Sequence, residues 1–156
     1  MSVFLELYHA IQACISMFAA LLSVMAIYNL NQWEPQAESA SRYSNTASRQ
    51  LHKTRTTQAS GALATLLSLV SSVICVVTAS SGANTTPFLL SATNTGGLFL
   101  AYSHIENFWR DKGKVPFSQS YNDGVRSSQQ MLQVLGGLGI SWAAATSIYL
   151  FRAIAY

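Results

Sequence analysis

Residues 87–102, PFLLSATNTGGLFLAY, decide how many times this chain crosses a membrane. The stretch is apolar at both ends, but its middle carries Asn94 between two threonines, followed by Gly96 and Gly97. A membrane-spanning helix needs about 20 largely apolar residues to cross about 30 Å of hydrocarbon. This stretch is the weakest of the four apolar segments in the chain, so the choice between three and four spans depends on it.

The composition predicts a protein whose outer surface faces lipid. Half of the 156 residues are hydrophobic and 10% are charged, against roughly 25% charged residues in soluble domains. We therefore expect an all-α integral membrane four-helix bundle, with residues 1–156 forming a single transmembrane domain. The expected spans lie at about 10–30, 60–80, 87–105 and 131–153, joined by basic loops at 31–59 and 106–130.

The placement of the basic residues favours four spans over three. Of the nine Lys and Arg residues, all except Arg152 lie in the loops 31–59 and 106–130, whereas residues 81–86 carry no charge. Four spans place both basic loops on one side, which the positive-inside rule assigns to the cytoplasm or to the matrix or stroma of an organelle. Both termini would then lie on the other, non-cytoplasmic side of a multi-pass protein. The sequence does not identify which membrane holds the protein.

Several classes of protein are not expected. The first ten residues contain Glu6 and no Lys or Arg, unlike the positive start of a signal peptide, so the first segment should remain in the mature protein. The basic residues lie in segments that flank apolar runs, which is the placement expected of membrane loops, and we expect no nucleic-acid partner. Cys14 and Cys75 lie in separate apolar segments and predict no metal site. His52 and His104 have no spacing diagnostic of haem ligands, and we expect no cofactor.

The segments between the expected helices contain residues that commonly end a helix. Residues 33–44 are polar and contain Pro35, so we expect them to be irregular, with the second helix extending back to about Asn45. The sequence NDG at 122–124 is a turn signal, which predicts that the last helix begins near Val125.

Small residues recur at steps of three or four in the second and fourth segments. Such stripes are typical of close helix packing in membranes, although they could also line a pore or a ligand crevice. The stripes comprise Gly61, Thr65, Ser68, Ser72, Cys75 and Ala79 in the second segment, and Gly137, Ser141 and Ala145 in the fourth.

Asn94 is a candidate binding residue because its amide lies inside an apolar segment. A polar group in hydrocarbon costs several kcal/mol unless it is hydrogen-bonded. We expect Asn94 to face the bundle and to bond to another helix or to water. As a functional residue it would line the path of a substrate or an ion.

The densest polar cluster is SHIENFWRD at 103–111. His104 and Glu106 are the candidate catalytic residues, because both can transfer protons beside an amphipathic substrate at the membrane surface. Arg110 is a candidate binding residue and lies at i,i+4 from Glu106, where the two can pair. The alternative is a solvated helix end whose charges fix the depth of the helix.

Two other polar motifs lie near the expected non-cytoplasmic surface. Glu6, His9 and Gln12 recur along one helix face and predict either a proton-labile patch or a polar helix entrance. The triplet at 84–86 is a glycosylation sequon at Asn84. Its position close to the bilayer, directly before Pro87, argues against modification.

No catalytic motif is recognisable, and whether the chain is an enzyme stays open. We expect a non-catalytic membrane subunit or scaffold that packs against partner helices in a larger membrane assembly. The partners would be membrane lipids and other membrane protein subunits, or further copies of the chain. The alternatives are a small membrane enzyme acting on a lipid-like or terpenoid-like substrate, and a small transporter or channel.

Overall fold

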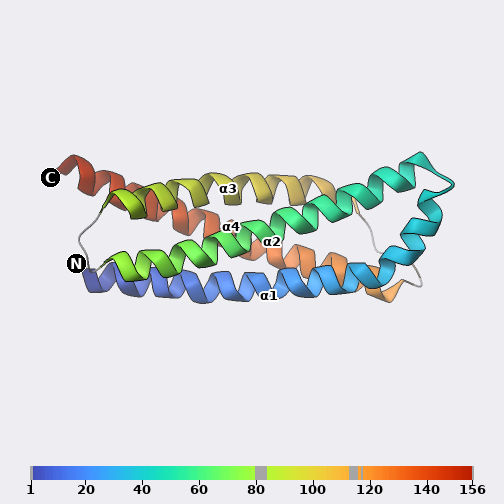
Figure 1. Cartoon of the computed structure of the whole chain (residues 1–156), viewed down its shortest axis with the longest axis horizontal. Coiled ribbons are helices and arrows are strands. Elements are labelled where there is room, and N and C mark those ends of the chain that lie inside the picture. Colours follow the sequence, from blue (N-terminus) through green and yellow to red (C-terminus); the bar gives the residue numbers. More distant parts are fainter. Residues whose placement is uncertain (1, 80–83, 113–115, 117, 156) are drawn as a thin grey trace.

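A computed structural model describes residues 2–79, 84–112, 116 and 118–155, and the described chain is all-helical. This confirms the all-α part of the predicted fold class. The helices, drawn in Figure 1, are α1 (Ser2–Ser41), α2 (Asn45–Ala79), α3 (Thr85–Trp109) and α4 (Gln119–Ala155).

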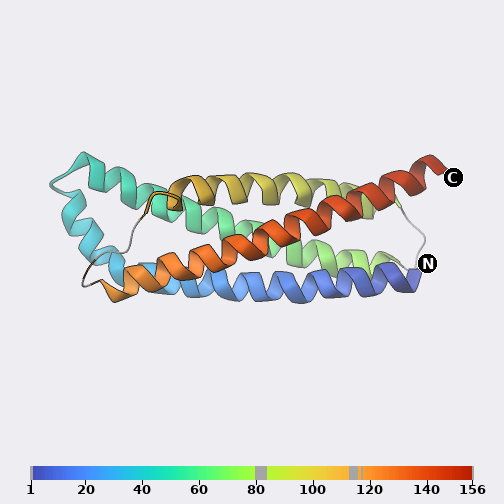
Figure 2. The ribbon, with the colours of Figure 1, turned by 180° about the vertical axis from the view of Figure 1, so that it is seen from behind.

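The four helices form one elongated bundle in which neighbours in sequence are neighbours in space. Helix α1 packs against α2 and α4, and α3 packs against the same two helices from the other side. Both chain ends lie at one end of the bundle, and the α1–α2 hairpin projects beyond α3 at the other end (Figures 1 and 2). The connection between α1 and α2 therefore lies at an end of the bundle rather than along its side.

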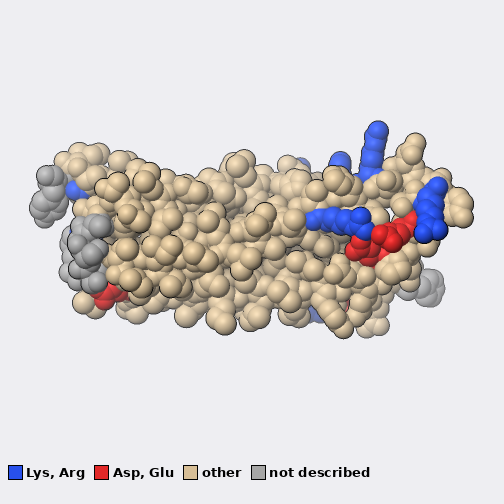
Figure 3. All heavy atoms as spheres, in the orientation of Figure 1, with Lys and Arg blue, Asp and Glu red and all other residues tan. Residues whose placement is uncertain are grey.

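Three helices, α1, α2 and α4, are long and apolar enough to cross a membrane. Helix α3 is not among them, because the Asn, Thr and Gly residues in its middle lower its hydropathy. On the face shown in Figure 3, the charged side chains gather at the ends, mostly at the α1–α2 hairpin, and the middle carries none. The sequence extends this to every face, because residues 7–33, 56–105 and 127–151 contain no Asp, Glu, Lys or Arg, and the bundle has the long uncharged middle that a bilayer requires.

The expectation of an irregular segment at 33–44 is wrong for 33–41, because α1 continues to Ser41 with Pro35 inside the helix, and only residues 42–44 lie between the helices. Proline lacks an N–H and its ring crowds the preceding turn, so it bends a helix without always ending it. The last turns of α1 change direction accordingly (Figure 1). Ser39 donates to the carbonyl of Pro35 over 3.0 Å. The predicted start of α2 at Asn45 is confirmed.

The expected start of the last helix near Val125 is also wrong, because α4 begins at Gln119 and residues 122–124 are helical. Gly124 serves close packing here. A Cβ atom at Gly124 would lie 2.5 Å from Cγ of Leu30, a buried residue of α1. The glycine allows the first turns of α4 to lie against α1. Gly124, which the sequence placed in a turn, therefore contributes to helix packing.

The small-residue stripe of α2 faces the bundle, as predicted. Gly61, Thr65, Ser68 and Cys75 are all buried, and a Cβ at Gly61 would lie 2.6 Å from the end of the Met131 side chain. The stripe of α4 divides: its Ala145 is buried, but its Gly137 lies on the outer surface, where an added Cβ would meet no atom within 4 Å.

Candidate functional site

A polar network lies inside the bundle at the end that carries the termini. His9 is 0% exposed and Gln12 is 1% exposed, and both extend from α1 into the interior. Nδ1 of His9 lies 2.6 Å from Oε1 of Gln12, and Nε2 lies 2.8 Å from the hydroxyl of Tyr149 on α4. Because a carbonyl oxygen only accepts, Nδ1 carries the proton in this arrangement and Nε2 accepts from the tyrosine.

The network continues from Gln12 to a second residue of α4. The Gln12 amide donates to Oγ of Ser141 over 2.8 Å. The hydroxyl of Tyr8 donates to the backbone carbonyl of Ser141 over 2.7 Å and lies 2.9 Å from its Oγ. These contacts join α1 to α4 at two adjacent levels.

A second set of polar contacts brings in α2. Oγ of Ser68 lies 2.7 Å from Oγ of Ser16 and accepts from Nε1 of Trp142 over 2.8 Å. One α2 serine therefore holds both α1 and α4. In lipid, hydrogen bonds of this kind supply helix association that the hydrophobic effect does not.

The prediction of a solvated, polar helix entrance at these residues is wrong, because His9 and Gln12 are buried. Glu6 is half-buried and is not a member of the network. The spacing of His9 and Gln12 was visible in the sequence. Their partners on α4 were not, since no local pattern shows which of its residues face α1.

Asn94 lies inside the bundle at 1% exposure, as expected. Its amide nitrogen donates to the carbonyl of Leu90 over 2.8 Å, so it bonds to its own helix and not to another. Its Oδ1 is buried and has no hydrogen-bond partner among the described residues. The binding role of Asn94 stays a prediction.

The structure separates the two candidate catalytic residues. His104 is exposed and Glu106 is half-buried, and residues two apart on a helix project about 200° apart. Glu106 lies 3.9 Å from Arg110, which also donates to Asn107 over 2.6 Å. The predicted i,i+4 pair is therefore present, while the catalytic roles of His104 and Glu106 and the binding role of Arg110 stay predictions.

His104 lies at the boundary between a polar pocket and an apolar groove, both between α2 and α3. The pocket, about 490 Å³ in volume, is lined by Gln50, Lys53 and Thr57 from α2 and by His104, Asn107, Phe108, Asp111 and Lys112 from α3 and its C-terminal end. Burial lowers the pKa of Lys112, and the neighbouring charge of Lys53 lowers it further, while Asp111 acts in the opposite direction. The sequence did not single out these lysines because they come from different loops.

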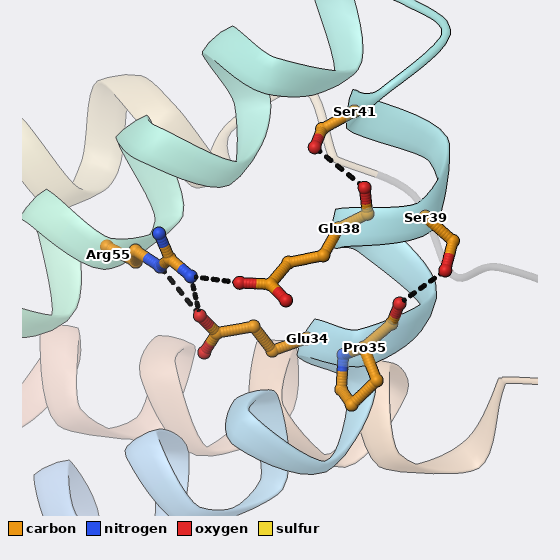
Figure 4. A network of polar contacts seen from close by, with 6 residues as sticks. All are labelled: Glu34, Pro35, Glu38, Ser39, Ser41 and Arg55. Atoms are coloured by element: carbon orange, nitrogen blue, oxygen red, sulfur yellow. Dashed lines mark hydrogen bonds and ion pairs between the residues drawn. The ribbon is translucent and has the colours of Figure 1, made fainter.

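The α1–α2 hairpin is held by an ion-pair cluster that the sequence also did not single out. Arg55 of α2 donates through Nε to Glu34 over 2.7 Å and through Nη2 to Glu38 over 2.8 Å (Figure 4). These hydrogen bonds, that to Glu34 first, raise the pKa of Arg55 above its ordinary value. The glutamates lie on either side of Pro35, so the cluster holds the bent end of α1 against α2.

Asn84 directly precedes α3, and its Oδ1 is buried without a hydrogen-bond partner in the described chain. Whether it is glycosylated stays a prediction. Among the described residues, no three His, Cys, Asp or Glu side chains lie close enough together to hold a metal ion. No protein-family model matches this chain, and neither a curated protein nor a solved structure is similar to it.

Proposed function

We propose that this chain is a non-catalytic integral membrane subunit, and that the outer surface of α3 and α4 packs against helices of a partner protein in a larger assembly. The observation that carries this proposal is an asymmetry in side-chain size around the bundle. The outer surface of α1 presents large apolar side chains, as lipid-facing helices do: Val3, Phe4, Leu7, Ile11, Ile15, Met17, Phe18, Leu21, Val24 and Met25.

The outer surfaces of α3 and α4 are different, because small or polar residues interrupt their apolar side chains. Thr93 and Gly96 of α3 are exposed, as are Gly137, Ala144 and Ser147 of α4. No atom lies within 4 Å of a Cβ added at either glycine. Small residues at such positions let the backbone of another helix approach closely, which is how helices associate in a bilayer.

The seam between these two helices forms an outward-facing groove of about 430 Å³. Thr95 and Tyr102 line it on α3, and Gly136, Gly139 and Ala143 line it on α4. The groove follows rows of residues three or four apart. Ridges of a partner helix pack into grooves of this kind.

A partner over this surface also accounts for the low hydropathy of α3. A helix that is partly covered by protein does not need the apolar surface of a helix surrounded by lipid. On this proposal α3 is the fourth span, both termini lie on the non-cytoplasmic side, and the basic end lies in the cytoplasm, matrix or stroma.

The experiment compares complexes extracted from the native membrane in a mild detergent. Gly96→Leu and Gly137→Leu add bulk to the proposed interface at exposed positions where an added Cβ meets no atom within 4 Å, so the bundle should fold. Cys14→Leu places the same side chain on the exposed surface of α1 and serves as the control. We expect both glycine variants to lose a copurifying partner subunit that the wild type and the control retain.

A wild-type protein that extracts with lipid alone would contradict the proposal. A complex containing only copies of this chain would also overturn the assignment to a larger assembly. Retention of the partner by both glycine variants would exclude the surface of α3 and α4 as the interface.

A further inference from the structure

Two lysines at the basic end of the bundle lack carboxylate partners. Among the described residues, the ion pairs are those of Arg55 and Arg110, so neither Lys53 nor Lys112 is paired. Both lysines line the α2–α3 pocket. Nζ of Lys112 donates to the side-chain oxygen of Gln50 and lies 4.9 Å above the ring of Phe108. Two cations thus face one cavity that contains a single acidic residue, Asp111.

The other polar groups of this pocket can donate hydrogen bonds. Gln50 and Asn107 carry amide N–H groups and His104 carries a ring N–H, and all three line the cavity. Ammonium and N–H donors around a positively charged cavity are the chemistry that binds a phosphate group. The cavity of about 490 Å³ is wide enough for such a group.

An apolar groove begins where the polar pocket ends. His104 lines both, and the groove continues between Leu63 and Leu67 of α2 and Gly97 and Leu98 of α3 as far as Asn94. A soluble phosphate compound would leave this apolar groove empty. The charge of the pocket and its continuity with the groove together indicate an amphiphile.

The length of the groove matches one leaflet. His104 and Asn94 are ten residues apart on α3, which corresponds to about 15 Å at the rise of an α-helix. The hydrocarbon of one leaflet is also about 15 Å thick, half of the roughly 30 Å core. An acyl chain entering beside His104 would therefore run along the groove to the middle of the bilayer.

We infer that the α2–α3 face is a binding site for an anionic glycerophospholipid, with the phosphate between Lys53 and Lys112 and an acyl chain in the groove below His104. Basic pockets between membrane helices on the cytoplasmic or matrix side hold anionic headgroups in this way. The site does not depend on the proposed partner interface, which lies on the outer surfaces of α3 and α4. Its lipid would fix the depth and tilt of α3, which is not among the helices long and apolar enough to cross a membrane alone.

The test measures lipid binding to the full chain in mild detergent by native mass spectrometry, with phosphatidylglycerol and phosphatidylcholine as probes. We expect phosphatidylglycerol to bind at least tenfold more tightly than phosphatidylcholine. The double variant Lys53→Gln/Lys112→Gln should lose about 30-fold in affinity for phosphatidylglycerol. Arg42→Gln removes one exposed charge at the same end, outside the pocket, where salt and water screen it from the lipid phosphate, and should stay within about twofold of the wild type.

A second variant tests the acyl-chain half of the site. Gly97→Leu fills the groove, and a Cβ at this position meets only the end of Leu67 at 3.9 Å, so the bundle should tolerate it. We expect it to weaken phosphatidylglycerol binding about tenfold while leaving the lysines in place. Inorganic phosphate at millimolar concentration should not displace the lipid.

Three results would overturn the inference. Equal affinity for the two lipids would exclude charge recognition, and a double-lysine variant that keeps its affinity would exclude this pocket. Displacement of the lipid by inorganic phosphate, together with unchanged binding by Gly97→Leu, would show an anion site that does not use the groove.

Discussion

Tyr149→Phe removes one oxygen atom from the interior of the bundle and keeps the ring in place. That oxygen lies 2.8 Å from Nε2 of His9, which is 0% exposed. In the variant, Nε2 would stay buried without a partner, and an unsatisfied buried group costs about 1–3 kcal/mol. Hydrogen bonds between membrane helices reach about 1.7 kcal/mol in double-mutant cycles. We therefore expect the free energy of unfolding to fall by about 1–2 kcal/mol.

The assay is reversible unfolding of the full chain in mixed micelles as the fraction of denaturing detergent is raised. Tyr28→Phe makes the same chemical change on the outer surface of α1 and should leave the unfolding free energy unchanged. A double-mutant cycle with His9→Leu should give a coupling energy of about 1 kcal/mol. A Tyr149→Phe variant as stable as the wild type, with no coupling to His9, would refute the role assigned to the network.

Other substitutions test packing and charge. Gly124→Ala should lower the free energy of unfolding by about 1–3 kcal/mol, because its Cβ would overlap Leu30. Gly137→Ala, whose Cβ meets no atom, should raise the free energy of unfolding by about 0.5–1 kcal/mol. Equal effects of the two substitutions would contradict the close packing of Gly124 against Leu30. Burial and the neighbouring Lys53 lower the pKa of Lys112. The unfolded chain therefore keeps the Lys112 proton to a higher pH than the folded chain does. The folded state gains stability as the pH rises through this range toward about 10.4, the pKa of an unperturbed lysine. Lys112→Gln should abolish that part of the gain in pH-dependent unfolding, and an unchanged slope would contradict it. Arg55→Gln should leave the free energy of global unfolding unchanged, because its ion pairs are exposed. It should speed hydrogen exchange at the bent end of α1, which Arg55 holds against α2. Unchanged exchange there would contradict this role of Arg55.

The apolar runs predicted the helices well, because hydrophobic length is a local property of the sequence. The helix boundaries were less predictable. Pro35 and the NDG turn signal at 122–124 both lie inside helices, since contacts with α2 and α1 outweigh local breaking tendencies. Gly124 looks like a turn residue until Leu30 is seen against it.

The candidate site shows a similar limit. The burial of Asn94 followed from its place in an apolar run, but its unpaired Oδ1 depends on which atoms surround it. Nor could the sequence connect His9 to Tyr149, 140 residues away, or Lys53 to Lys112. Such pairs arise only when the helices pack, and a single sequence gives no independent sign of them.

Membrane topology tests the central claim most directly, because it depends on whether α3 crosses the bilayer. Single cysteines at Ser44, between α1 and α2, and at Ser118, just before α4, can be labelled with a membrane-impermeant maleimide in sealed vesicles after Cys14 and Cys75 are replaced by alanine. Four crossings predict that both positions react from the same side of the membrane. Labelling of Ser44→Cys and Ser118→Cys from opposite sides would contradict the four-span bundle.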